Sequence, residues 1–525
     1  MGANRPGAPF SRRTLLQGAA AAGLAAGGGL VVASCGTPAP PRSAHASTTR
    51  ATSHPSGGPL DWGVLAASLR GSLVIPGDAS YGTDALLYNS VFTPAPAAIA
   101  YCATAADVQR CLAFARQHEV PIAARSGGHS YGGYSTTSGL VIDLSVLKTV
   151  SLSGTGTAAR ATVGAGASLI EVYSQLGTAG YLLPGGSCPS VGIAGLALGG
   201  GIGVFGRAYG MTCDHIEAID LVTADSTVRR CSATQHDDLH WASQGGGGGN
   251  FGIATSFAFR LHPIPDVTLF TLEWPWAAAT DVMGAWLNWI GDTPDALWAN
   301  CQCFPATVSA GVMKVTGVCA DTVAACTSAL APLTSAIGAA PTYRFVGPEQ
   351  YLRAMLIEAG CQNEPVAQCA AADTRYPFAA KSTYVNGPPS DAVISALVSS
   401  LGTFGADVPQ AGGGLVFDGY GGAINAVDPA ATAFVHRSAV ACAQYSVTFP
   451  TASPSAAEAS AARSWLDAVA QVLAPVAHGS YQNYIDPTLS DWAEAYYGAN
   501  LPRLRSIKRK WDPDGVFHFA QSIPA

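Results

Sequence analysis

Two short glycine-rich segments, each holding one nucleophilic side chain, constrain this chain more than any other feature. The first is Arg125-Ser126-Gly127-Gly128-His129-Ser130-Tyr131-Gly132-Gly133, and the second is Gly185-Gly186-Ser187-Cys188-Pro189-Ser190-Val191-Gly192. Glycine has no Cβ, so its backbone can approach a bulky anionic ligand closely and donate N–H groups to it. Pro189 restricts the second loop, which can therefore hold the Cys188 sulfur at a fixed point. The two segments predict a site for a bulky anionic ligand beside two nucleophiles.

The order and spacing of these segments resemble those of the berberine bridge enzyme-like flavoproteins. In that family one FAD is bonded to both side chains, to His at the 8α-methyl carbon and to Cys at ring carbon C6. The resemblance therefore implies a bicovalent FAD on His129 and Cys188, with small-residue loops around it. It runs from about Ala95 to Pro524, and it is thin between Val267 and Phe378.

Each nucleophile alone has a plainer interpretation. A lone His in a glycine loop is usually a turn residue, and a lone Cys is usually a buried structural thiol. Their joint occurrence favours the flavin, and Ser126 to Gly128 then form a nest for pyrophosphate oxygens. The resemblance places these residues around the FAD: Arg125, Ser126, Gly127, Gly128, His129, Ser130, Cys188, Val191, Gly192, Gly195, Gly199, Gly252, Ile253, Asn483 and Tyr484.

The implied fold is the α+β fold of the vanillyl-alcohol oxidase superfamily. It combines a PCMH-type FAD-binding domain of two subdomains with a substrate domain, in which helices flank a large antiparallel sheet. We assign residues 1–58 to an export signal and tether, 59–265 to the FAD-binding domain, 266–479 to the substrate domain and 480–525 to a C-terminal segment that returns to the FAD domain. Periodicity predicts helices over 105–119, 166–176, 323–331 and 454–473, the last with Ser453 as its N-cap.

A third glycine run contains G-x-G-x-x-G at Gly201, Gly203 and Gly206, followed by Asp220. A dinucleotide-binding fingerprint needs an apolar strand that ends at the first glycine. Here Gly195 interrupts the approach, and Asp220 lies inside its own predicted strand over 216–223. We interpret this run, and the glycines at 245–249, as further parts of the flavin cradle.

The first fifty residues predict export. Ser11-Arg12-Arg13-Thr14-Leu15-Leu16-Gln17 is a twin-arginine signal, and a glycine-rich apolar run follows it to Ala33. Val32-Ala33-Ser34-Cys35 resembles a lipobox, which would leave Cys35 lipid-modified, whereas Ala44-His45-Ala46 is an ordinary cleavage site. Both alternatives stay open. We expect an extracellular or cell-surface protein that touches the membrane only through a lipid on Cys35, with residues 37–58 as a flexible tether.

The net charge of −7 and a sequence pI near 5.8 give no general reason to expect nucleic acid as a partner. Thirteen cysteines fit an oxidising destination. Their spacing suggests local disulfides for the pairs Cys102/Cys111, Cys319/Cys326 and Cys361/Cys369. Cys301 and Cys303 are two residues apart on a predicted strand, so they share one face. Without a nearby His they are a poor metal-ligand set, and we expect no zinc site.

Oxidation of an alcohol by two electrons needs a base for the hydroxyl proton and an acceptor for the hydride. The acceptor in the family is flavin N5. Tyr481-Gln482-Asn483-Tyr484 resembles the family's N-Y motif and implies Tyr484 as the base. A phenol that titrates near ~10 needs a neighbouring cation to act at neutral pH. Lys381, in a K-x-x-Y segment, could supply that charge, and Tyr384 and Tyr420 are candidates for a second active-site tyrosine.

The resemblance implies an oxidase that transfers hydride from an alcohol or sugar hydroxyl to FAD and reduces O2 to H2O2. In the family the residue three positions after the Cys, here Val191, leaves space for O2 when it is small. Relatives such as glucooligosaccharide oxidase and aclacinomycin oxidoreductase point to a carbohydrate or a glycosylated metabolite. Two alternatives stay open, namely a tailoring dehydrogenase or C–C bond-forming enzyme with another acceptor, and a non-catalytic flavin-containing surface lipoprotein.

Overall fold

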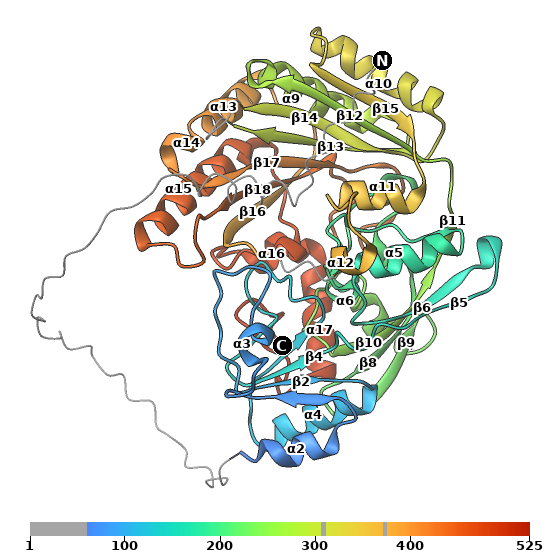
Figure 1. Cartoon of the computed structure of the whole chain (residues 1–525), viewed down its shortest axis with the longest axis vertical. Helices are drawn as coiled ribbons and strands as arrows, with labels where there is room; N and C mark the ends of the chain where they lie inside the picture. Colours follow the sequence, from blue (N-terminus) through green and yellow to red (C-terminus); the bar gives the residue numbers. More distant parts are fainter. Residues whose placement is uncertain (1–59, 306–310, 371–374) are drawn as a thin grey trace, which may run out of the picture.

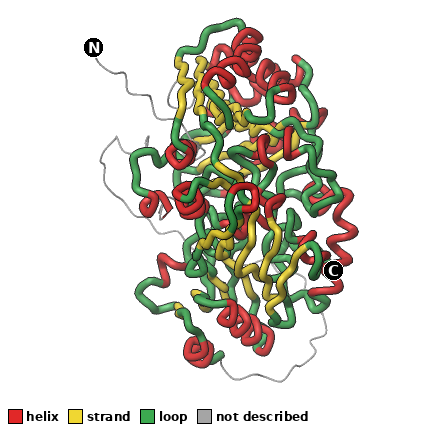
Figure 2. Tube along the Cα trace, turned by 90° about the vertical axis from the view of Figure 1, so that its right-hand side faces the viewer, coloured by secondary structure: helices red, strands yellow, loops and turns green. Residues whose placement is uncertain are grey.

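The computed structural model describes residues 60–305, 311–370 and 375–525, which form an elongated α+β fold (Figures 1 and 2). A seven-stranded sheet and its helices occupy one end, and sheets of four and five strands occupy the other. The twin-arginine motif, Cys35, the second cleavage site and the tether all lie outside the described residues, so the export signal remains a prediction.

The four-stranded sheet has the order β1-β2-β4-β3. Its strands are β1 (Ser72–Val74), β2 (Ala98–Tyr101), β3 (Ile122–Arg125) and β4 (Leu140–Asp143), and the neighbouring helices are α2 (Trp62–Ser68), α3 (Tyr81–Asp84) and α4 (Ala105–Gln117). Strands β2 and β3 both pair with β4 in parallel, and α4 provides the crossover that a parallel connection needs. The first glycine loop begins where β3 ends, so this sheet positions His129.

The five-stranded antiparallel sheet has the order β5-β6-β10-β8-β9. Its strands are β5 (Val150–Ser153), β6 (Arg160–Gly164), β8 (Ile216–Val222), β9 (Val228–Ser232) and β10 (Ile253–Arg260). The helices are α5 (Leu169–Thr178), α6 (Ile193–Leu198), α7 (Gly206–Tyr209) and α8 (Asp237–Ala242), and β7 (Tyr181–Leu182) pairs with β11 (His262–Pro263). Helix α5 starts later than predicted because a capping box between Ser168 and Glu171 fixes its first turn.

The seven-stranded sheet is antiparallel throughout, with the order β15-β12-β14-β13-β17-β18-β16. Its strands are β12 (Thr268–Pro275), β13 (Leu297–Phe304), β14 (Val312–Cys319), β15 (Tyr343–Pro348), β16 (Phe378–Val385), β17 (Gly412–Gly419) and β18 (Ala441–Thr448). The helices that accompany it are α9 (Ala279–Trp289), α10 (Val323–Ile337), α13 (Asp391–Gly402), α14 (Phe404–Asp407) and α15 (Ala456–Leu473), whereas α11 (Tyr351–Glu358) and α12 (Val366–Ala370) pack against α5. Helices α9, α10, α13 and α15 lie along the outer side of the sheet (Figure 1).

The two faces of this sheet differ in chemistry. Side chains of the apolar core, such as Cys301 and Phe417, alternate with buried polar ones, such as Gln302 and Asp418. Because successive side chains of a strand point to opposite faces, one face packs against the outer helices and the other presents polar groups. The polar face therefore supplies the side chains that can reach a bound molecule.

Two helix boundaries differ from the sequence prediction. Helix α15 is capped by Ser455, whose hydroxyl accepts the Glu458 N–H while the Glu458 carboxylate binds the Ser455 N–H, so the predicted cap Ser453 lies outside it. Helix α10 continues through Pro332 to Ile337, beyond the predicted end, because Leu333 and Ile337 still pack in the core.

Of the three predicted disulfides, the structure forms Cys361–Cys369, between α11 and α12. Cys102 and Cys111 are thiols with sulfur atoms 3.9 Å apart, and Cys319 and Cys326 are also thiols. Cys301 and Cys303 share one face of β13, as predicted, with sulfur atoms 4.0 Å apart. Within the described ranges no three His, Cys, Asp or Glu side chains gather as a metal site, and no helix has the length and apolarity of a membrane span.

The C-terminal segment packs back onto the FAD-binding half, where α17 (Leu501–Trp511), which follows α16 (Trp492–Tyr497), contacts α8. Lys508 anchors it, because its buried ammonium donates to the Asn250 and Phe517 carbonyls and to the Asp512 carboxylate. This contact holds the chain around Phe517 beside the glycine loop that ends at Gly249.

Candidate functional site

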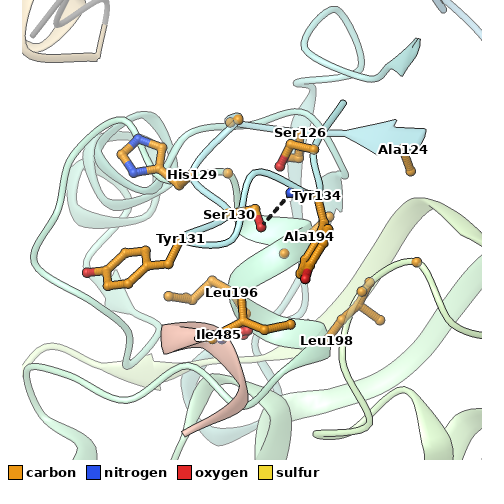
Figure 3. A pocket seen from close by; sticks show the side chains of 18 of the residues that line it. Ala124, Ser126, His129, Ser130, Tyr131, Tyr134, Ala194, Leu196, Leu198 and Ile485 are labelled. Atoms are coloured by element: carbon orange, nitrogen blue, oxygen red, sulfur yellow. Dashed lines mark hydrogen bonds between the residues drawn. The ribbon is translucent and has the colours of Figure 1, made fainter. Parts of the chain in front are cut away.

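A cavity of about 520 Å³ lies where both glycine loops meet the polar face of the seven-stranded sheet and the C-terminal segment. That volume is within the range of small-molecule and cofactor sites. The first loop contributes residues 126–131, the second 186–188, 191 and 192, and the C-terminal segment 481–485 and 517–520. Figure 3 shows His129, Ser130 and Tyr131 projecting from one stretch of loop above Leu196 and Ile485.

Close backbone contact between the two loops explains their glycines. A Cβ at Gly127 would lie 2.3 Å from the Gly192 nitrogen, and one at Gly192 would lie 2.0 Å from the Ser126 hydroxyl. Real Cβ atoms do not approach that closely, so both positions need glycine. Gly195 does not make such a contact. A Cβ there would meet no protein atom within 4 Å and would project into open space at the cavity wall, so the glycine leaves that space free.

His129 is held in its neutral form at the cavity wall. Its ring stacks on Tyr88 with centroids 3.8 Å apart, and Nε2 lies 3.0 Å from the Ser190 hydroxyl. The side chain is partly exposed, but toward the internal cavity, and its removal from bulk water lowers the pKa of His129 to about 3. A neutral imidazole keeps one nitrogen lone pair, which a nucleophile requires.

The structure brings most of the predicted cofactor residues to this cavity. Those that line it are Ser126, Gly127, Gly128, His129, Ser130, Cys188, Val191, Gly192, Gly195, Gly252, Ile253, Asn483 and Tyr484. Arg125 does not, because its buried guanidinium binds Asp143, its register partner on β4, at 2.5 Å. Gly199 does not line the cavity either. It packs against Asn483, whose Oδ1 would lie 2.0 Å from a Cβ at position 199.

The predicted base, Tyr484, lies on the short 3₁₀ helix Gln482–Tyr484 and lines the cavity. Its ring stacks on Tyr131, with centroids 5.2 Å apart and planes inclined by 18°. The Gln444 side-chain N–H donates to the Tyr131 hydroxyl at 2.7 Å. Sequence reasoning missed Tyr131 and Gln444, although Tyr131 follows His129 by two residues in the same loop and could have been found there.

Lys381 is not among the residues that line the cavity, so its assistance to Tyr484 stays a prediction. Its ammonium lies 2.7 Å from the Asp486 carboxylate and 3.2 Å from that of Asp467 on α15, so two anions already match its charge. Because Lys381 and Tyr384 are three residues apart on β16, they point to opposite faces of the sheet.

Tyr384 and Tyr420 form a pair behind the cavity wall. Both are fully buried, their hydroxyls lie 3.2 Å apart, and Tyr384 stacks on His436. Neither lines the cavity, and burial raises the pKa of both phenols. Two tyrosines of the cavity wall contact Tyr484 instead: Tyr131 stacks on its ring, and Tyr481 meets it edge-on with centroids 4.9 Å apart.

The third glycine run, Gly201 to Gly206, lies against the wall of the cavity. It follows a short helix, α6, and the Gly201 N–H donates to the Tyr481 hydroxyl at 2.8 Å. Asp220 lies inside β8, where it accepts from Ser256 and Arg230. This agrees with the interpretation that the run is not a dinucleotide-binding fingerprint.

Comparison with known proteins assigns the family. A model described as "FAD binding domain" matches residues 96–232, and one described as "Berberine and berberine like" matches residues 480–524. The chain is 32% identical over 478 residues to the uncharacterised FAD-linked oxidoreductase YgaK of Bacillus subtilis, covering 87% of this chain and 97% of that protein. The chain belongs to the berberine bridge enzyme-like FAD-linked oxidoreductases. It is an oxidoreductase that binds FAD, and its α+β fold is the PCMH-type fold of that family.

Other members of the family cover nearly the same length. The chain is 30% identical to a chitooligosaccharide oxidase of Gibberella zeae, over 85% of this chain and 91% of that protein. It superposes on Physcomitrella patens BBE-like 1 with a TM-score of 0.80 at 33% identity, over 89% of this chain and 99% of the other. A xylooligosaccharide oxidase from Myceliophthora thermophila, solved with xylobiose, gives a TM-score of 0.79 at 26% identity, over 88% and 98%.

Proposed function

We propose that this member is an oxidase that carries FAD on both His129 and Cys188 and oxidises a hydroxyl of a carbohydrate or glycosylated metabolite. When bound, FAD would supply the acceptor for the hydride and, with O2, a route for the two electrons to H2O2. The observation that carries the proposal is that one cavity is lined by His129, Cys188 and Tyr484 together. Alcohol oxidation needs a hydride acceptor and a base, and these residues could supply two attachment points for a flavin and a phenol as the base.

The residues present fit FAD. Glycines at 127 and 192 bring the two loops together, and Gly195 leaves open space at the wall. His129 would hold the flavin through a neutral nitrogen, and Cys188 would hold it through sulfur from the neighbouring loop. The buried hydroxyl of Thr136, also at the wall, has no protein hydrogen-bond partner within the described residues, so it is free to donate to a ligand oxygen.

Polar atoms on β18 support a hydroxyl-rich substrate. The carbonyl oxygen of Gln444 and the hydroxyl of Ser446 line the cavity, and neither has a partner in the described part of the chain. Buried polar atoms left unpaired are costly, so a ligand with several hydroxyls would satisfy them. Relatives named as chitooligosaccharide and xylooligosaccharide oxidases agree with a sugar.

In the proposed reaction Tyr484 takes the proton of the substrate hydroxyl. Tyr131 stacks on the Tyr484 ring and is itself fixed by Gln444, so the phenol keeps one orientation. The experiment that tests the function is a screen of the purified protein against sugars and polyketide glycosides. Bleaching of the flavin without oxygen and H2O2 formation in air support the proposal, whereas bleaching without H2O2 would assign a dehydrogenase.

The double variant His129→Ala/Cys188→Ala is expected to lose all covalent flavin. Acid precipitation should leave wild-type protein yellow and the double variant colourless, and a tryptic digest of wild type should yield one flavin that bridges two peptides. Each single variant should retain FAD through the other bond. Since the pKa of His129 is about 3, attachment at His129 should be as complete at pH 6 as at pH 8. Flavin that stays bound in the double variant contradicts the assignment.

We also propose export by the twin-arginine route, supported by the sequence of residues 11–17. Replacing Arg12 and Arg13 with lysine should retain the precursor in the cytoplasm, as fractionation and immunoblotting would show. Cys35→Ala separates the two processing sites. It should release the protein from the membrane fraction if the lipobox is used, and should have no effect if cleavage follows Ala46.

A further inference from the structure

Ser190 is placed to decide which nitrogen of His129 is nucleophilic. Its hydroxyl lies 3.0 Å from Nε2. In a neutral imidazole one nitrogen carries the proton and the other carries the lone pair. When Nε2 donates its proton to Ser190, Nδ1 keeps the lone pair and can attack. Burial alone accounts for the lowered pKa of His129, so no charged group takes part in this choice.

Tyr88 touches both predicted attachment residues. Its ring stacks on the His129 imidazole, with planes inclined by 23°, and its hydroxyl is hydrogen-bonded to Cys188. Burial raises the pKa of Tyr88, so its hydroxyl keeps a proton to donate to sulfur. Its backbone is fixed as well, because its N–H donates to Gly128 and its carbonyl accepts from Tyr376. A donor beside the sulfur stabilises the thiolate, the form of Cys that reacts.

We infer that Ser190 and Tyr88 are positioning residues for flavin attachment, Ser190 by orienting His129 for attack through Nδ1 and Tyr88 by holding the His129 ring and the Cys188 sulfur. The inference rests on the proposed bicovalent FAD. It assigns a role to a residue of the second loop, Ser190, and to one outside both loops, Tyr88.

The chemistry balances with O2 as oxidant. At His129 an N–C bond forms while a C–H bond of the 8α-methyl group breaks, and at Cys188 an S–C bond forms while the C6–H bond breaks. Each step releases two protons, one from carbon and one from the imidazole N–H or the thiol. With the two electrons of the broken bond, they reduce one O2 to H2O2.

The two residues make opposite predictions about the product. The full-length chain is prepared from riboflavin-limited cells and incubated with FAD, and acid-quenched samples are mapped by peptide mass. Ser190→Ala should slow attachment at His129 about tenfold, the typical effect of one hydrogen bond, and accumulate flavin held by Cys188 alone. Tyr88→Phe keeps the ring and removes the hydroxyl, so it should accumulate flavin held by His129 alone.

Matched variants separate positioning from loss of fold. Ser190→Thr retains a hydroxyl and should attach both bonds at the wild-type rate, whereas Tyr88→Leu removes the stacking and should slow both. General misfolding would lower both bonds together in Ser190→Ala, and that result overturns the inference, as does His129 attachment at the wild-type rate. If the wild-type digest holds no bridged flavin, the proposed function fails first. If the wild-type digest holds bridged flavin, but Ser190→Ala and Tyr88→Phe do not accumulate flavin on opposite residues, the inference alone fails.

Discussion

Replacing Tyr484 with phenylalanine is expected to slow flavin reduction by substrate about 10²–10⁴-fold, the usual contribution of a positioned general base. The change removes one oxygen and keeps the ring that stacks on Tyr131. Cofactor attachment and the oxidised flavin spectrum should therefore survive. Stopped-flow absorbance of the flavin under anaerobic conditions measures the effect directly.

Tyr384→Phe and Tyr420→Phe are the matched controls, because each also removes one phenol oxygen. Their hydroxyls bond each other behind the cavity wall, so flavin reduction should stay close to the wild-type rate while thermal stability falls. A reductive rate that is unchanged in Tyr484→Phe and lowered in a control would move the base to the buried pair and exclude Tyr484 from that role.

Local sequence predicted the parts of the site that are close together along the chain. The two glycine loops could be recognised because each needs small residues within a few positions, and the structure presses Gly127 against Gly192. The strands and the long helices were likewise recognisable from periodicity. The role of Arg125, at the end of β3, could not be predicted in this way. Its pairing with Asp143 depends on a parallel register that no local pattern reveals.

Contacts between distant segments explain the remaining misses. Gln444 reaches Tyr131 across 313 positions of sequence, and nothing near Gln444 marks it as part of the site. Lys381 was predicted to supply a cation to Tyr484, but nothing near it in the sequence indicates that its ammonium pairs with the carboxylates of Asp467 and Asp486.

The polar face of the seven-stranded sheet shows how the fold and the proposed chemistry are linked. On β13, Asn300 and Gln302 face the same way and alternate with Cys301 and Cys303, which pack under the outer helices. On β18, Gln444 and Ser446 continue that face to the cavity. A sheet buried on both sides thus keeps polar side chains without exposing them to water, which is what a site for hydroxyl oxidation requires.

Val191→Ile is expected to leave flavin reduction nearly intact while reoxidation by air slows by orders of magnitude. Val191 is half-buried at the cavity wall, and its carbonyl is fixed by the N–H of Leu169 at the start of α5. Overpacking a tight core costs ~1–3 kcal/mol, but here the extra methylene can extend into open space, so the fold should tolerate it. That same methylene occupies the volume that O2 needs beside the flavin.

Mixing pre-reduced protein with oxygenated buffer in a stopped-flow instrument measures the reoxidation rate. Val191→Ala is the control, because it enlarges the space and should reoxidise at least as fast as wild type. Both variants keep the backbone contact to Leu169, so a difference between them reports the side chain alone. If wild type already reoxidises as slowly as the isoleucine variant, the electrons must leave to a quinone or protein acceptor, and O2 is not the physiological oxidant.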